Sequence, residues 1–349
     1  MNLSVSSATR FQVSSPVAER HHAQSVALLW AKRYIRFLDQ PSDLSSADLG
    51  APASGPSTLT PAQLRSQTAQ KVARNLPLVT GQALSVTHKF LDQEIRQQRI
   101  DPHHLDSLQI AADNRRLFQM VLDVFAAGHS PDHLSAKGSR EFGRVRQYYT
   151  QQDGRVLGFL GMHVHHTIRC LLEQLTLAEQ ACFEPYLRVM NDHLYMPLQV
   201  AYEAAAEHDP DSPALQAVQA LLPLSSEIAR RVFEQICEQF PHYTSHSGHL
   251  RAPVVEESSL RDVELFQVYL CVCVLEGSIR SVQHELFPLC VMLYPRLMVS
   301  WELVRAMIQT IEVNMQRMIP RQTIRPLLPY IRVMKDIFSP EVFEAIRCD

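Results

Sequence analysis

The sequence predicts an all-α fold, a multi-helix two-layer bundle with a tethered N-terminal helix. Glycine is scarce, with 11 residues, whereas proline is frequent, with 21. Because sheet-rich folds need many glycine turns, this ratio favours helices that are separated by prolines. Aromatic residues make up only 7 % of the chain, which argues against a β-sandwich or a β-barrel.

The composition is that of a globular protein with one large core or two domains, with 349 residues of which 46 % are hydrophobic. A formal net charge of −3 argues against extensive coating of nucleic acid. The 7 cysteines are odd in number and form no CxxC pair, so we expect reduced thiols in a cytoplasmic protein. The longest apolar runs fall well short of the ~20 residues that a membrane-spanning helix needs.

The N-terminal region divides into three expected segments, which are a disordered stretch (1–22), a helix (23–40) and a flexible linker (41–60). Apolar residues at helical spacing support the helix, and a high content of Ser, Pro, Gly and Ala supports the linker. Trp30, Tyr34 and Phe37 stand beside basic residues, a combination that suits a helix-in-groove contact. We therefore expect this helix to dock on the body of the chain or on a protein partner.

Residues 61–349 are predicted to form the helical body. Its first helix begins at a capping box of Thr60 and Gln63 and runs to about Arg99, with a candidate break at 76–82.

The middle of the chain is predicted to form a helix over 105–127, a loop over 129–139 and further helices over 141–208. Thr176 and Glu179 fit a capping box, so we expect one helix to end and another to begin there.

The later segments are a turn (207–213), helices over 213–222 and 225–240, a polar loop (241–258), an apolar helical third (262–319) and a last helix from Ser339. The apolar third is rich in methionine, which fits irregular packing and adaptable interfaces. It therefore indicates heavy burial, or a surface that a partner or a second copy covers.

The stretch GMHVHHTIRC (161–170) gathers three histidines and a cysteine. At 100° per residue, a core stripe forms from Leu157, Leu160, Val164, Ile168, Leu171 and Leu175. His163, His166 and Cys170 share a second stripe, roughly opposite the first. Imidazole and thiolate are good ligands for transition metals, so these three are candidate metal ligands. The alternative, which we favour, is a polar stripe that faces water or another helix.

A second histidine cluster occupies the predicted loop FPHYTSHSGHLR (240–251), with His242, His246 and His249. These residues are candidates to bind a transition metal or to act as a general base near neutral pH. The favoured alternative is a solvated loop, since chance clusters are expected in a chain with 16 histidines.

A basic stretch near the C-terminus carries Arg321, Arg325, Arg332 and Lys335 with no acid among them. Such a stretch can contact an acidic partner, a lipid surface or a phosphate backbone, and the favoured alternative is a solvated face. The chain lacks GxSxG, SxxK, GxGxxG and GxxxxGK[ST], so neither nucleophilic nor phosphate chemistry has a recognisable motif.

Two segments, SSLRDVELFQVYLCVCVLE (258–276) and ELFPLCVMLYPRLMVSWELV (285–304), resemble a helical protein family of cyanobacteria. The resemblance covers only the C-terminal half and brings no catalytic motif. It implies a cytoplasmic, photosynthesis-related setting and no particular activity.

Taken together, these patterns predict a non-enzymatic interaction protein, an assembly or regulatory factor that acts through a protein partner or a second copy of itself. The alternative is a helical protein, either an enzyme or a binding protein, that binds a transition metal or another cofactor through its histidine clusters. Nucleic acid is not an expected partner.

Overall fold

The computed structural model describes residues 26–34, 60–97, 99–151 and 153–342, and it confirms the all-α prediction. The α-helices with assigned bounds are α2 (Pro61–Gln97), α3 (Ser107–Ala126), α4 (Pro131–Thr150), α5 (Val156–Leu172), α6 (Leu177–Tyr195), α7 (Leu198–Ala206), α8 (Pro213–Leu221), α9 (Ser225–Gln239), α10 (Pro253–Glu276), α11 (Phe287–Arg296), α12 (Trp301–Met318), α13 (Arg321–Ile324) and α14 (Leu328–Ile337). The other elements are the 3-10 turns η1 (Pro102–His104) and η2 (Leu222–Leu224), the π-helical turn η3 (Val282–Leu286), and the antiparallel strands β1 (Thr244–Ser245) and β2 (Gly248–His249).

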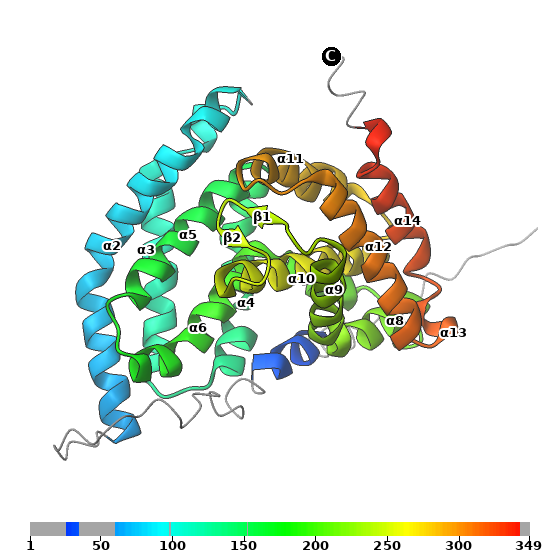
Figure 1. The fold of residues 1–349 in the computed structure, drawn as a ribbon. Coiled ribbons are helices and arrows are strands. Elements are labelled where there is room, and N and C mark those ends of the chain that lie inside the picture. The colour runs from blue at the N-terminus through cyan, green and yellow to red at the C-terminus, as the bar shows by residue number, and fades with distance from the viewer. Residues whose placement is uncertain (1–25, 35–59, 98, 152, 343–349) are drawn as a thin grey trace, which may run out of the picture.

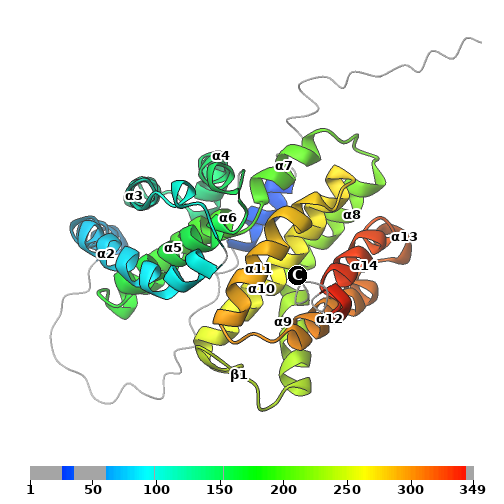
Figure 2. The same cartoon turned by 90° about the horizontal axis from the view of Figure 1, so that it is seen from above.

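The helices form two groups that pack face to face (Figures 1 and 2). In the first group, α2 packs on α3 and α5, and α4 packs on α6. In the second, α10 packs on α7, α8 and α9, while α12 packs on α9 and α14. Contacts of α11 with α5 and of α7 with α4 join the two groups. Within the described ranges, no helix combines the length and the apolarity needed to cross a membrane.

Helix α2 runs without interruption through the segment where a break was expected. Pro77 lies inside it, although proline removes one helical hydrogen bond. Leu76, Val79 and Ala83 are all buried at helical spacing, so packing on α3 and α5 holds the helix together across the proline. The predicted break at 76–82 is therefore wrong.

Two predicted loops are partly helical in the structure. Helix α4 begins at Pro131, inside the expected loop 129–139, and α10 begins at Pro253, inside the expected loop 241–258. In both helices proline occupies the first turn, where its missing N–H is not needed. In α4, small buried residues such as Ser135 let the helix pack closely on α6.

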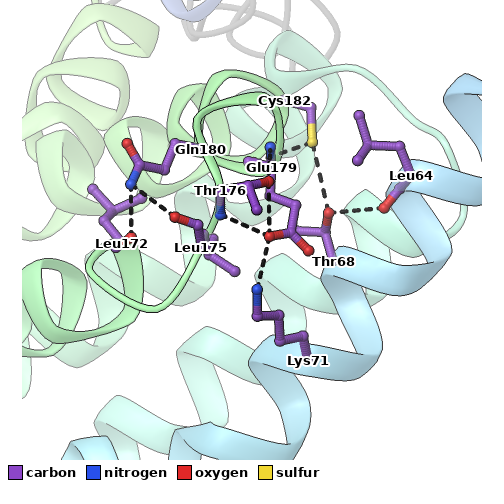
Figure 3. A network of polar contacts seen from close by, with 9 residues as sticks. All are labelled: Leu64, Thr68, Lys71, Leu172, Leu175, Thr176, Glu179, Gln180 and Cys182. Carbon is purple, nitrogen blue, oxygen red and sulfur yellow. Dashed lines mark hydrogen bonds and ion pairs between the residues drawn. The ribbon is translucent and has the colours of Figure 1, made fainter. Parts of the chain in front are cut away.

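The capping box predicted at the start of α6 is confirmed and is drawn in Figure 3. The Thr176 hydroxyl accepts a hydrogen bond from the Glu179 backbone N–H at 3.3 Å, and the Glu179 carboxylate accepts from the Thr176 N–H at 2.8 Å. Lys71 of α2 donates to the same carboxylate at 2.9 Å. Burial alone raises the pKa of Glu179, but these hydrogen bonds outweigh it and lower that pKa. The network ties the start of α6 to α2.

The helix over 26–34, dark blue in Figure 1, docks on the body of the chain. Trp30 and Tyr34 are buried there, and the Tyr34 hydroxyl donates a 3.0 Å hydrogen bond to the Asp192 carboxylate. Arg33 forms a buried ion pair with Glu264 of α10. This helix was expected to dock either on the body of the chain or on a protein partner, and residues 26–34 dock on the body. Phe37, the whole stretch 1–22 and residues 41–59 of the linker lie outside the described residues.

Candidate functional site

A cavity of about 380 Å³ lies between the two helix groups. Its walls come from α2, α5 and α6 on one side, and from α9, α10, α11, α12 and the β1–β2 hairpin on the other. Most of its surface is apolar, supplied by residues that include Val86, Phe90, Met162, Phe233, Leu293 and Met307. This size and character are typical of small-molecule sites, which also favour the junction between two structural units.

An acidic side chain, Asp262 of α10, lies in the cavity wall. One carboxylate oxygen accepts a hydrogen bond from the Tyr195 hydroxyl at 3.3 Å, and the other accepts from the Tyr294 hydroxyl at 3.3 Å. Desolvation raises the pKa of Asp262, and the opposing charge of Arg261 limits that rise. The two tyrosines fix the carboxyl group beneath the apolar surface.

Basic groups line the same wall and have unused hydrogen-bonding capacity. The Arg261 guanidinium stacks over the Tyr195 ring, 4.7 Å from its centre, and its Nε is buried without a partner among the described residues. The same is true of Nε2 of His166 in α5. Burial, and then the charge of Arg261, lower the pKa of His165 to about 3, so this imidazole is neutral.

The rim of the cavity is formed by the hairpin and the connection between α11 and α12. The Tyr243 hydroxyl donates to the Met298 carbonyl at 2.7 Å and accepts from the Ser300 N–H at 2.6 Å. The His246 ring meets the edge of Phe90 from α2, with ring centres 5.7 Å apart. Met298 adopts a positive φ of 56°, a strained backbone that only its surroundings can hold.

His163, on the stripe that was expected to face water or another helix, contacts two neighbouring helices through polar groups. Its side chain is fully buried, with Nε2 3.0 Å from the Thr80 carbonyl of α2 and Nδ1 3.3 Å from the Asn114 amide of α3. Burial lowers the pKa of His163. The side chain is buried because α2 and α3 cover the side of α5 that sequence periodicity alone leaves open. The core stripe itself is confirmed, with Ile168 partly buried.

The two histidine clusters meet at the cavity, where His165 and His166 of the first and His246 of the second line the wall. Cys170 is half-buried and does not line the cavity. His242 is exposed, and Nε2 of His249 bonds the Pro241 carbonyl at 2.9 Å within the loop. In the part of the chain that the structure describes, no three His, Cys, Asp or Glu side chains come together in a way that could hold a metal ion.

The predicted basic stretch divides into two kinds of residue. Arg321, Arg325 and Arg332 are exposed, whereas Lys335 pairs with Glu312 of α12 at 2.9 Å. The lysine therefore has a structural contact within the chain, and only the arginines remain free to meet a partner.

Sequence reasoning missed the polar groups of the cavity wall. Arg261 and Asp262 are adjacent in the sequence, and neither was singled out as a candidate site residue. The available signal was a charged pair at the border of a strongly apolar helix. Tyr195 and Tyr294 are 99 positions apart, so only tertiary folding brings both hydroxyls to the same carboxylate.

Residues 201–336 match the family model of phycobilisome proteins, a helical family of cyanobacteria and red algae. The match covers less than half of the chain and corresponds to the second helix group, from within α7 to within α14. No curated protein and no solved structure matches the chain. The two segments that resemble a cyanobacterial helical family both fall inside the matched region. This part of the chain is thus similar to phycobilisome proteins, and α2, α5 and α6 close its cavity from outside the match.

Proposed function

We propose that this protein binds an open-chain tetrapyrrole in the cavity, without a covalent bond. The observation that carries the proposal is the cavity between the phycobilisome-like region and the first helix group, with the half-buried carboxyl of Asp262 and the unpartnered nitrogens of Arg261 and His166. The family belongs to light-harvesting assemblies, whose pigments are of this chemical class. When bound, such a pigment supplies absorption of visible light.

The shape and polarity of the site support a ligand of this class. Pyrrole rings are flat and apolar, and they suit walls lined by aliphatic and aromatic side chains. The carboxylate of Asp262 accepts hydrogen bonds and is a suitable partner for pyrrole N–H groups. Tyr195 and Tyr294 hold that carboxylate in position.

The acidic side chains of a tetrapyrrole also have suitable partners. Arg261 offers an Nε–H with no partner in the described chain, and Arg169 lines the same cavity. Charge-assisted hydrogen bonds between guanidinium and carboxylate are among the strongest in proteins. Nε2 of His166, also unpartnered, provides a further polar contact for the ligand.

Attachment through a thioether is not supported by the cysteines. None of the described residues that line the cavity is a cysteine. Cys290, which neighbours Tyr294, is buried behind the wall, and burial raises the pKa of its thiol well above the usual range. A thiol of this kind is a poor nucleophile, so we propose non-covalent binding.

The test is a titration of the purified full-length protein with biliverdin, followed by visible absorption. We expect saturable binding at one pigment per chain, with a shifted and sharpened long-wavelength band. Asp262→Asn and Arg261→Gln should each weaken binding about tenfold or more, because each removes a charged partner of the ligand. His242→Ala, which alters an exposed histidine of the rim loop, is the matched control and should bind as the wild type does.

Unfolding the complex in acidic urea should release the pigment from the polypeptide. Pigment that stays on the chain would contradict non-covalent binding, and the absence of saturable binding would contradict the proposed ligand class.

An assembly or regulatory role is the second candidate function. It is favoured by the similarity to proteins that work as subunits of complexes, and by the exposed arginines of the C-terminal edge. Retrieval of subunits by the immobilised chain, lost on reversing the charge of these arginines, would support it. A metal-dependent function has no comparable support in the described residues.

A further inference from the structure

The C-terminal edge of the molecule carries a strongly basic surface. Four exposed arginines, here called the arginine surface, lie at the end of α12 and along α13 and α14: Arg317, Arg321, Arg325 and Arg332. No carboxylate of the described chain forms an ion pair with any of them. Val333, 41 % exposed, adds an apolar contact point to the same helix.

This surface stands on a firmly packed support. Ile324, Leu327, Ile331, Met334 and Phe338 are all buried against the body of the protein. The helices that carry the arginines are therefore fixed, which lowers the entropy lost when a partner binds. Figures 1 and 2 show α13 and α14 at the outer edge of the molecule, and α13 packs on α8.

An acidic surface lies where α7 and α10 end. Five exposed carboxyl groups, here called the acidic corner, come from Glu203, Glu207, Asp209, Asp211 and Glu276. None of them has a cationic side chain at ion-pair distance within the described residues. Burial, and then the charge of Glu285, raise the pKa of Glu276. The charge of Arg280 opposes this rise, and the charge of Glu207 adds to it.

The position of these acids is electrostatically unfavourable in the isolated chain. Glu207 caps the C-terminus of α7 and Glu276 is the last residue of α10, where the helix dipole disfavours negative charge. His208 holds the corner rigidly, with Nε2 2.7 Å from the Leu275 carbonyl and Nδ1 2.8 Å from the Ser212 hydroxyl. Cations from outside the chain would relieve this repulsion.

The two charged surfaces belong to adjoining elements, because α8 follows the acidic corner directly and packs on α13. A phosphate backbone or an anionic membrane that approached the arginine surface would also approach the acidic corner and be repelled by it. A partner with both charges in the reverse order avoids this conflict, and a second copy of the chain turned by a two-fold rotation presents them in that order.

We propose that two copies of this protein associate about a two-fold axis, with the arginine surface of each facing the acidic corner of the other. All four basic residues are arginines, whose planar guanidinium can bind a carboxylate through two parallel hydrogen bonds. Each contact would occur twice in the dimer. This inference is independent of the proposed ligand, since no residue of either surface lines the tetrapyrrole cavity.

Sedimentation velocity of the full-length protein at about 50 mM and about 500 mM salt tests the proposal. We expect a dimer at low salt whose dissociation constant rises about tenfold or more at high salt, because exposed charges are screened. Arg321→Glu with Arg325→Glu should give monomers, and so should Glu207→Lys with Asp209→Lys. Arg74→Glu with Lys89→Glu, on exposed positions of α2, changes the charge equally and should leave the dimer intact.

Mixing the two charge-reversed variants is the decisive step. Within a mixed dimer every contact is again between opposite charges, so dimers should return although each variant alone is monomeric. Circular dichroism verifies that each variant is folded. Three results would overturn the proposal. The wild type could be monomeric under all conditions, the charge-reversed variants could still form dimers on their own, or the mixture could stay monomeric. A series of ever larger species would contradict the two-fold arrangement.

Discussion

His193 shows how far burial changes the chemistry of a single residue. Its ring lies in the core, where Nδ1 is 2.8 Å from the Val189 carbonyl and Nε2 is 3.3 Å from the Ser135 hydroxyl. Desolvation, and then the charge of Arg33, lower its pKa to about 4, although the contact with Val189 opposes this shift. The folded protein therefore keeps this histidine neutral at pH values where the unfolded chain is already protonated.

We expect His193 to make the protein less stable as the pH falls. Its pKa is about 6.5 in an unfolded chain, so the unfolded state takes up a proton below that pH, whereas the folded state does so only near pH 4. Across this window the free energy of unfolding should fall by roughly 3 kcal/mol from this group. Urea denaturation of the wild type and of His193→Gln from pH 7 to pH 4 measures the difference. Parallel curves for the two proteins would contradict the assignment.

At the residue scale, sequence reasoning found the unusual side chains but not their roles. His166 and His246 both reach the cavity, as members of clusters that were singled out for their density. The full burial of His163 could not be predicted, because helical periodicity describes one helix and cannot tell how many neighbours cover it. The role of Asp262 depends on two tyrosines from distant helices, and no local pattern contains that information.

The start of α6 is the element that the sequence predicted most completely, since the reciprocal bonds of Thr176 and Glu179 are as expected. Thr176→Ala removes the acceptor for the Glu179 N–H and should lower the free energy of unfolding by about 1 kcal/mol. Thr176→Ser keeps the hydroxyl and should stay close to the wild type. Midpoints of urea unfolding measure both variants, and equal losses for Ala and Ser would show that the methyl group matters rather than the cap.

Prolines explain most errors at the scale of elements. Pro131 and Pro253 each begin a helix inside a segment that was interpreted as a loop, and Pro77 sits within α2. A proline marks a helix start as readily as a loop, and only the burial of the residues after it distinguishes the two cases. At Pro61, where Thr60 and Gln63 exchange the hydrogen bonds of a capping box, the start was predicted correctly.

The helix over 26–34 is held by the buried pair of Arg33 and Glu264. Glu264→Gln leaves the guanidinium buried without its carboxylate and should lower the free energy of unfolding by about 3–5 kcal/mol. The double variant Arg33→Met with Glu264→Leu replaces both charges by apolar groups and should recover most of that loss. Urea unfolding of the two variants decides the matter, and a small effect of Glu264→Gln would mean that the pair contributes little.

At the scale of the whole molecule, the cavity exists only because the two helix groups meet. His166 and His246 are 80 positions apart, and the first helix group lies outside the region that is similar to phycobilisome proteins. The all-α class followed from composition and periodicity, whereas this meeting depends on tertiary packing between segments distant in sequence.

Because both helix groups contribute walls, a bound ligand should stabilise the entire fold. A ligand that binds only the folded state adds about 2.7 kcal/mol at a concentration one hundred times its dissociation constant. We therefore expect the unfolding temperature of the wild type to rise as the biliverdin concentration is increased. At the same biliverdin concentration, the rise should be smaller in Arg261→Gln. Scanning calorimetry measures both proteins with and without pigment. An equal shift in the two would mean that the pigment stabilises the protein from outside the cavity, since a ligand held by Arg261 must lose affinity when that charge is removed.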